Sequence, residues 1–190
     1  MRGRNTTESW GWVARLLHWS IAAIILFQLG LGIYMTDVVS ELTEQFRLFQ
    51  LHKSWGFVVF VLVLARIAWR LANRRSPRHP PGQPRWQAAA SHATHAALYV
   101  LMFVLPLSGW VMASASTTQD LFSIRNMVFG LFEMPDPWVP GNKAIADAAG
   151  TVHEWAAWAM IAILALHAAA ALKHHLVDRD DVLKRMAWGR

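Results

Sequence analysis

The stretch "TVHEWAAWAMIAILALHAAAALKHH", from Thr151 to His175, decides the fold, because it is apolar enough to cross a membrane yet carries four of the chain's nine histidines. About 20 consecutive apolar residues span a bilayer as a helix. Three other stretches meet this criterion, so four spans are predicted, at 14–35, 48–71, 88–115 and 145–176. The sequence therefore predicts an all-α integral membrane four-helix bundle, with residues 1–190 forming a single domain.

The overall composition agrees with a membrane protein and excludes several chemistries. Only 16% of the residues are charged and 55% are hydrophobic, whereas about a quarter of a soluble domain is charged. The chain has no cysteine. This excludes a Cys-ligated iron–sulfur cluster, a covalently attached c-type haem and any disulfide.

The net charge of +6 reflects topology. The segments on one side of the predicted membrane hold most of the cations, namely Arg2, Arg4, Arg15, Arg70, Arg74, Arg75, Arg78, Arg85, Lys173, Arg179, Lys184, Arg185 and Arg190. The opposite loops hold four cations (Arg47, Lys53, Arg125 and Lys143) and seven acids (Asp37, Glu41, Glu44, Asp120, Glu133, Asp136 and Asp147). The positive-inside rule then places both termini in the cytoplasm. The basic excess indicates attraction to anionic lipid rather than to nucleic acid.

The histidines inside the spans indicate a functional site, because ionisable side chains in a membrane are costly. His153 and His167 are 14 residues apart, which is nearly four helical turns, so both project from one face and lie about 21 Å apart along the axis. At matching depths on other spans lie His52, level with His153, and His18, level with His167. Two imidazole pairs stacked across a bilayer are the arrangement expected for two haem b groups, each with two axial histidine ligands.

The histidines inside the spans also fit other roles. A single membrane histidine often hydrogen-bonds a neighbouring helix. A proton relay or a metal transporter is the next interpretation. Zinc transport would need carboxylates beside the imidazoles, and the helix interiors offer only Glu154. On the third span, His92 and His95 are candidates to replace His18 as a ligand or to line a quinone pocket.

Three further residues are candidate cofactor contacts. Arg66 lies 14 residues after His52, on the same helix face and at the depth of the cytoplasmic pair. A buried arginine needs an anion, and a haem propionate is the natural partner. His174, at the membrane edge, is a candidate hydrogen-bond donor to a propionate or a quinone carbonyl. Lys53, next to His52, is the candidate cation at the opposite rim.

Five motifs resemble those of the bacterial cytochrome b561 family, over nearly the whole chain. They are "RLLHWSIA" (15–22), "HKSWGFVVFVLVLARIAWRL" (52–71), "LPLSGWVM" (105–112), "VHEWAA" (152–157) and "LHAAAALKHH" (166–175). The histidine spacing is also similar to that of the cytochrome b subunits of membrane hydrogenases and formate dehydrogenases. The resemblance implies four spans in the bacterial inner membrane and two haem b groups, held by His52 with His153 and by His18 with His167.

The resemblance also implies superoxide:ubiquinone oxidoreductase activity, with superoxide giving its electron at the periplasmic face and ubiquinone as acceptor. In that reading Lys53 is the candidate catalytic residue, which attracts the anion together with Arg125 and Lys143. The periplasmic loops hold more acids than cations, which keeps a second interpretation open. In it the chain is a redox subunit that docks on a partner dehydrogenase or on another periplasmic redox protein. A haem-free membrane scaffold is the third.

Overall fold

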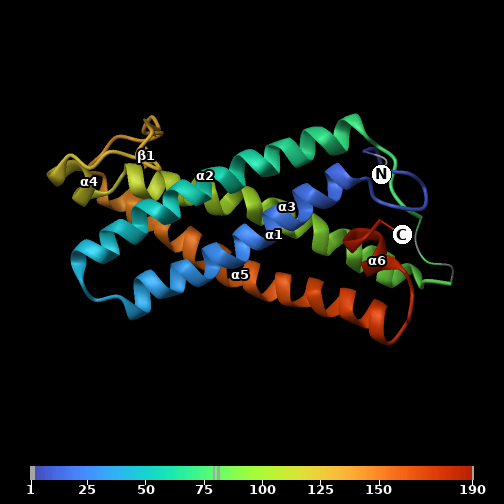
Figure 1. The fold of residues 1–190 in the computed structure, drawn as a ribbon. Helices are drawn as coiled ribbons and strands as arrows, with labels where there is room; N and C mark the ends of the chain where they lie inside the picture. Colours follow the sequence, from blue (N-terminus) through green and yellow to red (C-terminus); the bar gives the residue numbers. More distant parts are fainter. Residues whose placement is uncertain (1–2, 79, 81, 190) are drawn as a thin grey trace. The chain divides into compact units, whose positions relative to one another are not determined.

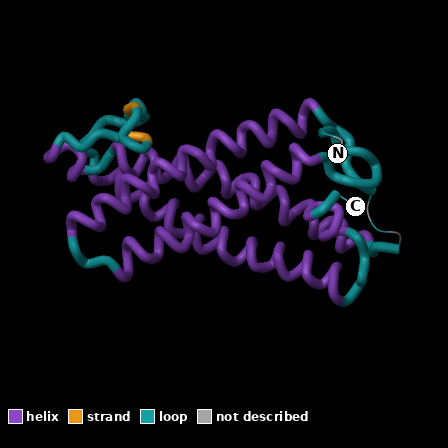
Figure 2. The backbone as a smooth tube through the Cα atoms, viewed as in Figure 1, coloured by secondary structure: helices purple, strands orange, loops and turns teal. Residues whose placement is uncertain are grey.

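The computed structural model describes residues 3–78, 80 and 82–189, and within them helices account for most of the chain (Figures 1 and 2). Four helices are long: α1 (Trp12–Ile33), α2 (Leu42–Ala72), α3 (Arg85–Ser114) and α5 (Lys143–Leu176). The short elements are η1 (Tyr34–Val38), α4 (Thr117–Phe122), β1 (Met127–Val128), β2 (Phe132–Glu133) and α6 (Val182–Ala187).

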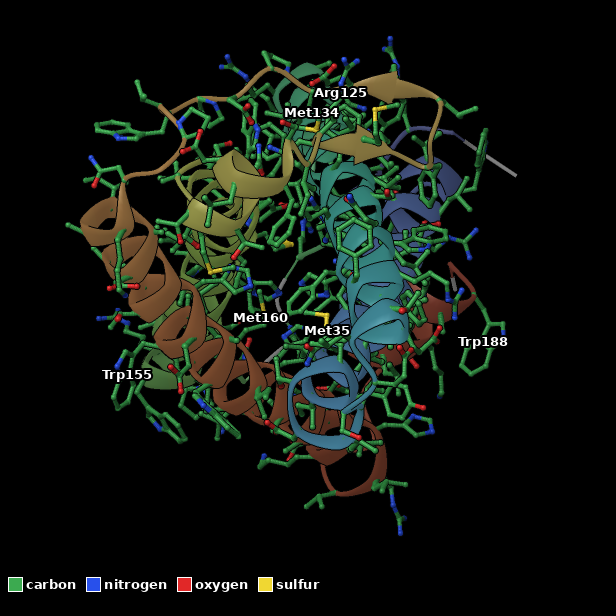
Figure 3. All side chains as sticks on the ribbon, turned by 90° about the vertical axis from the view of Figure 1, so that its left-hand side faces the viewer. Met35, Arg125, Met134, Trp155, Met160 and Trp188 are labelled. Carbon is green, nitrogen blue, oxygen red and sulfur yellow. The ribbon has the colours of Figure 1, made fainter. Side chains whose placement is uncertain are left out.

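The four predicted spans are confirmed as long apolar helices, three of them within three residues at each end, whereas the second begins six residues earlier than predicted, at Leu42. All four long helices, the first with its extension through Val38, are long and apolar enough to cross a membrane. Few of their residues are buried within the protein, and large apolar side chains such as Leu26, Val100 and Leu166 are exposed. Trp155, 71% exposed, points away from the neighbouring helices (Figure 3). Apolar surfaces of this kind are suited to contact with lipid rather than with water.

The chain divides into two compact units, which are described separately. The terminal unit comprises Met1–Ala22, Leu62–Val100 and Met160–Arg190, and the loop unit comprises Ala23–Val61 and Leu101–Ala159. Each of the four long helices contributes one segment to each unit. That residues 1–190 form one domain stays a prediction, as does the cytoplasmic location of the termini. Two of the cations used for that orientation, Arg2 and Arg190, lie outside the described residues.

The terminal unit brings the start of α1 beside α6 (Figure 1). The indole Nε1 of Trp19 donates to the carbonyl of Met186 at 3.1 Å. Arg15 Nη1 donates to the carbonyl of Ala187 at 3.3 Å. These carbonyls belong to the last turn of α6, whose acceptors have no partner within the helix. Residues of α1 therefore cap α6.

The loop unit carries a small hairpin between α3 and α5. Strands β1 and β2 pair antiparallel, with Val128 opposite Phe132. The turn between them uses Gly130, at φ +71°. The hairpin packs on α2, with the Phe129 ring 5.4 Å from that of Trp55 and the Phe132 ring 5.8 Å from that of Phe57. The apolar middle of the link between α3 and α5 therefore covers part of α2.

A carboxylate fixes the start of α2. Glu41 precedes the helix, and its side chain accepts hydrogen bonds from the backbone N–H groups of Thr43 at 2.9 Å and Glu44 at 2.6 Å. These bonds satisfy donors that a helix N-terminus leaves free. The same bonds hold the pKa of the Glu41 carboxyl below its usual value. The helix therefore begins at Leu42.

Candidate functional site: two histidine clusters

The terminal unit gathers three of the histidines singled out in the sequence. His18 of α1 and His167 of α5 face each other, with ring centres 6.3 Å apart and planes at 74°. His95 of α3 lies nearer to His167, at 5.1 Å between ring centres. Its Nδ1 donates to the carbonyl of Ser91, one turn earlier, at 2.7 Å. The three helices thus present their imidazoles to one region of this unit.

Arg66 of α2 contacts the His18 ring directly, which the sequence did not predict. Its Nη1 lies 3.0 Å from His18 Nδ1, and its Nε donates to the Tyr99 hydroxyl at 3.0 Å. A guanidinium can only donate, so His18 Nδ1 is the acceptor and the ring proton lies on Nε2. Arg66 and Tyr99 thereby fix the orientation of the His18 ring.

The loop unit holds the second pair. The rings of His52 on α2 and His153 on α5 lie 6.2 Å apart between centres, with planes at 76°. His153 Nδ1 lies 2.9 Å from the carbonyl of Leu105 and 3.2 Å from the Ser108 hydroxyl. Donation to a carbonyl places the proton on Nδ1 and leaves Nε2 with a free lone pair. The backbone of α3 therefore selects the tautomer in which Nε2 can bind a metal.

His52 is held by its backbone, and one of its ring nitrogens lacks a partner. Gln28 Nε2 donates to the His52 carbonyl at 2.9 Å. The ring's Nδ1 is buried and has no hydrogen-bond partner among the described residues. An unsatisfied buried polar atom costs about 1–3 kcal/mol. A ligand bound to this ring would add a favourable interaction at a site that otherwise carries this cost.

Gly109 is a site residue that the sequence analysis did not single out. A Cβ added there would lie 3.0 Å from Cε1 and 3.2 Å from Nδ1 of His153, closer than side chains normally pack. The absence of a side chain therefore lets α3 approach the imidazole. The available signal was a glycine following Ser108 inside a predicted span, since such a glycine often marks a close approach.

The separations within the two pairs match one metal ion shared between two imidazoles. A metal–nitrogen bond of about 2.0 Å plus about 1.2 Å from nitrogen to ring centre, counted on both sides, gives about 6.4 Å between ring centres. The observed values are 6.2 Å and 6.3 Å. The distance of 5.1 Å between His95 and His167 is too short for the same arrangement. Of the two candidate partners of His167, His18 has the more suitable spacing.

Lys53 is half-buried and tied to the loop that follows α3. Its Nζ donates to Asn126 Oδ1 at 3.0 Å. Asn126 Nδ2 in turn donates to Asp136 Oδ1 at 2.5 Å, and Gln119 Nε2 donates to the same oxygen at 3.0 Å. The loop therefore fixes the position of Lys53 through the side-chain amide of Asn126. The carboxylate of Asp136 is bonded to Asn126 and not to Lys53 itself.

The other predicted rim cations each have a carboxylate partner. Lys143 Nζ lies 2.6 Å from Asp147, and Arg125 Nη1 lies 3.4 Å from Glu133. Arg125 and Met134 both belong to the loop after α3 (Figure 3). The charge of each cation is thus partly neutralised where it stands, whereas Lys53 meets an uncharged acceptor.

His174 lies at the end of α5, in contact with the acidic turn before α6. Its Nδ1 is 2.6 Å from Asp180 Oδ2 and 3.4 Å from Asp178 Oδ2. Lys173 also binds Asp178, at 2.6 Å. The structure thus gives the His174 ring local partners, and its contact with a propionate or a quinone stays a prediction.

Comparison with known proteins agrees with the family suggested by the motifs. Residues 9–189 match the family described as prokaryotic cytochrome b561. Cytochrome b561 homolog 2 of Escherichia coli (strain K12) is 33% identical over 182 residues, covering 96% of this chain and 93% of that protein. Cytochrome b561 homolog 1 of the same organism is 32% identical over 138 residues, 71% of this chain and 72% of that protein.

A third relative has a name that states an activity. The Yersinia pestis protein named "Probable superoxide oxidase CybB" is 31% identical over 136 residues, covering 72% of each chain. The match to the family extends over almost the whole sequence and includes all four long helices. The chain therefore belongs to the prokaryotic cytochrome b561 family of multi-pass membrane electron-transfer proteins that bind haem b.

Proposed function

We propose that this protein is a superoxide:ubiquinone oxidoreductase of the bacterial inner membrane, with both termini in the cytoplasm. Two superoxide anions would each lose one electron to become dioxygen, and one quinone would take up two electrons and two protons. The observation that carries this proposal is the presence, in each unit, of one imidazole pair with ring centres 6.2 Å or 6.3 Å apart. The name of the Yersinia pestis relative supports the choice of superoxide.

The proposal assigns the two pairs to two haem b groups. His52 and His153 would hold one, and His18 and His167 the other. When bound in this way, haem b supplies reversible one-electron chemistry and leaves no open position on its iron for oxygen. The protein's own contribution is to hold the rings in position, through Leu105 and Ser108 for His153.

Arg66 has a further role in this proposal. While His18 binds iron through Nε2, its Nδ1 carries the ring proton and cannot accept from a guanidinium. Arg66 would then release the ring and need another acceptor. A propionate of the bound haem would take that place, and Tyr99 would keep its bond to Arg66 Nε.

The experiment that tests the activity uses the purified haem-loaded protein under anaerobic conditions. Superoxide should reduce its b-type absorption bands, and added ubiquinone should re-oxidise them at a catalytic rate. Slow reduction by superoxide, together with isolation of the chain in a stable complex with a dehydrogenase, would instead support the docked-subunit reading. The seven acids among the predicted periplasmic loops favour that second candidate, because they would attract a basic protein.

Lys53 provides a sharper test of superoxide delivery. Lys53→Gln should slow haem reduction by superoxide by a few fold at low salt, because a local cation raises the encounter rate of an anion. Lys53→Glu should be slower still. Salt should shrink both differences, since charges are screened over about 8–10 Å at ordinary ionic strength. Stopped-flow absorbance at two salt concentrations measures each rate.

Lys143→Gln is the matched control for Lys53, because it removes the same charge from a residue already paired with Asp147. It should change the rate much less. Rates that respond equally to both substitutions, or to neither, would show that Lys53 does not guide superoxide.

Gly109→Ala tests the assignment of His153. The added methyl would push against the ring at 3.0 Å and disturb its bond to Leu105. Overpacking costs about 1–3 kcal/mol, which exceeds the gain of about 0.5–1 kcal/mol from replacing glycine in a helix. We expect lower haem content and a lower melting temperature. Haem extraction and thermal unfolding measure these effects.

Gly30→Ala in α1 is the control for Gly109→Ala, because a Cβ there meets no atom within 4 Å. It should leave haem content unchanged and should not lower the melting temperature. Full haem content in Gly109→Ala would show that the His153 ring does not need its present position.

A further inference from the structure

The terminal unit has far more cations than its own carboxylates can neutralise. By sequence it holds fourteen Lys and Arg residues and four Asp and Glu residues. Three of the four acids are engaged near the C-terminus: Asp178 and Asp180 with Lys173 and His174, and Asp181 with Lys184. The unit therefore has cations, among them the arginines at and just after the end of α2, that its own carboxylates do not neutralise.

Two of these arginines line a groove at the end of α2. Arg70 and Arg74 lie beside Ile67 and Leu71 around an open hollow of about 240 Å³. Arg70 is further positioned by the Tyr99 ring, whose centre lies 5.6 Å from its guanidinium carbon. Neither arginine forms an ion pair with a carboxylate among residues 3–78, 80 and 82–189. The groove thus combines two available guanidinium groups with two aliphatic side chains.

The chemistry of this groove is that of a ligand with an anionic head and an aliphatic body. Guanidinium groups bind phosphate oxygens in a bidentate manner. Basic residues at the end of a membrane-spanning helix lie at the depth of lipid head groups. Ile67 and Leu71 are one turn apart and offer an apolar surface toward the hydrocarbon side. We propose that Arg70 and Arg74 bind the phosphodiester of an anionic phospholipid whose acyl chain lies along Ile67 and Leu71.

The test uses the haem-loaded protein in neutral detergent after removal of bound lipid. Short-chain phosphatidylglycerol, phosphatidylcholine with the same acyl chains, and inorganic phosphate are titrated separately, and binding is followed by the melting temperature and by native mass spectrometry. Phosphatidylglycerol should bind most tightly and raise the melting temperature. Its affinity should fall as salt is added, because the interaction includes charges near solvent.

Substitutions locate the site. The double variant Arg70→Gln with Arg74→Gln should bind phosphatidylglycerol at least about tenfold more weakly, as expected when charge-assisted hydrogen bonds are lost. Arg85→Gln removes one cation from an exposed position of the same unit outside the groove, so it should change the affinity less than about twofold. The haem spectrum of each variant reports whether the protein is intact. If the double variant does not fold, Arg70→Lys, which keeps the charge but loses the bidentate geometry, should still weaken binding.

Three results would overturn the proposal. Equal affinities for phosphatidylglycerol and phosphatidylcholine would show that the net negative charge of the lipid head group does not contribute to binding. Inorganic phosphate binding as tightly as the lipid would show that the aliphatic half of the groove contributes nothing. A loss of binding free energy in Arg85→Gln about half as large as in the double variant, which removes two charges, would show that only net charge matters.

Discussion

His153→Ala should yield a protein with about half the wild-type haem content and an unchanged spectrum for the haem that is left. His167→Ala should give the complementary result. The reason is that the two histidines belong to different pairs, His153 with His52 in the loop unit and His167 with His18 in the terminal unit. Both pairs use a ring from α5, but the two rings lie in different units. The loss of one ring therefore leaves the pair in the other unit intact.

Haem extraction and reduced-minus-oxidised difference spectra measure this result. His175→Ala is the control for the loss of an imidazole, because this residue lies on α5 but belongs to neither pair. It should retain full haem. Loss of all haem from either single variant would indicate that the helices no longer pack, and full haem in either would remove that residue from the ligand set. Full haem in His18→Ala that is lost when His95 is also replaced would show that His95 takes part in ligation.

Arg66→Leu should lower the midpoint potential of the haem in the terminal unit. The oxidised iron carries one more positive charge than the reduced iron, so a nearby cation disfavours oxidation and its removal favours it. At an effective dielectric constant of about 20, a unit charge about 8 Å away contributes about 2 kcal/mol, or roughly 90 mV for a one-electron couple. We therefore expect a decrease on the order of 50–100 mV, measured by redox titration of the purified protein.

Two variants separate the charge of Arg66 from its geometry. Arg66→Lys keeps the charge and should recover most of the potential. Tyr99→Phe removes the acceptor of Arg66 Nε without changing charge, so its effect on the potential should be small. An unchanged potential in Arg66→Leu, with haem retained, would show that the guanidinium is remote from the bound group. The haem proposed for the loop unit would serve as an internal reference in each titration.

The sequence predicted the elements whose signals are long or periodic. The four spans follow from continuous apolar runs, and the alignment of His153 and His167 follows from a spacing of nearly four turns on α5. To place His52 at the depth of His153, and His18 at the depth of His167, only the direction of each helix through the membrane was needed. Their rings indeed lie opposite those of His153 and His167 in the separate units.

Features that depend on contact between distant residues were not predictable in the same way. Arg66 was expected to face an anion, yet it donates to His18, because the choice between acceptors depends on helix rotation. The bond between Lys53 and Asn126 depends on the path of a loop whose sequence has no periodic signal. The close approach of Gly109 to His153 needs the packing distance between α3 and α5, which no single helix encodes.

The capping of α6 by Arg15 and Trp19 has a consequence for biosynthesis. The bonded residues are 172 and 167 positions apart, so these contacts join an early segment of the chain to one that is synthesised much later. Contacts between such distant segments form late. The rest of α1 and the other three long helices, α2, α3 and α5, lie between the partners, so they can be made before α6 reaches its place. Docking of α6 would then act as a closing step, and a chain truncated before Met186 would leave Arg15 and Trp19 without these acceptors.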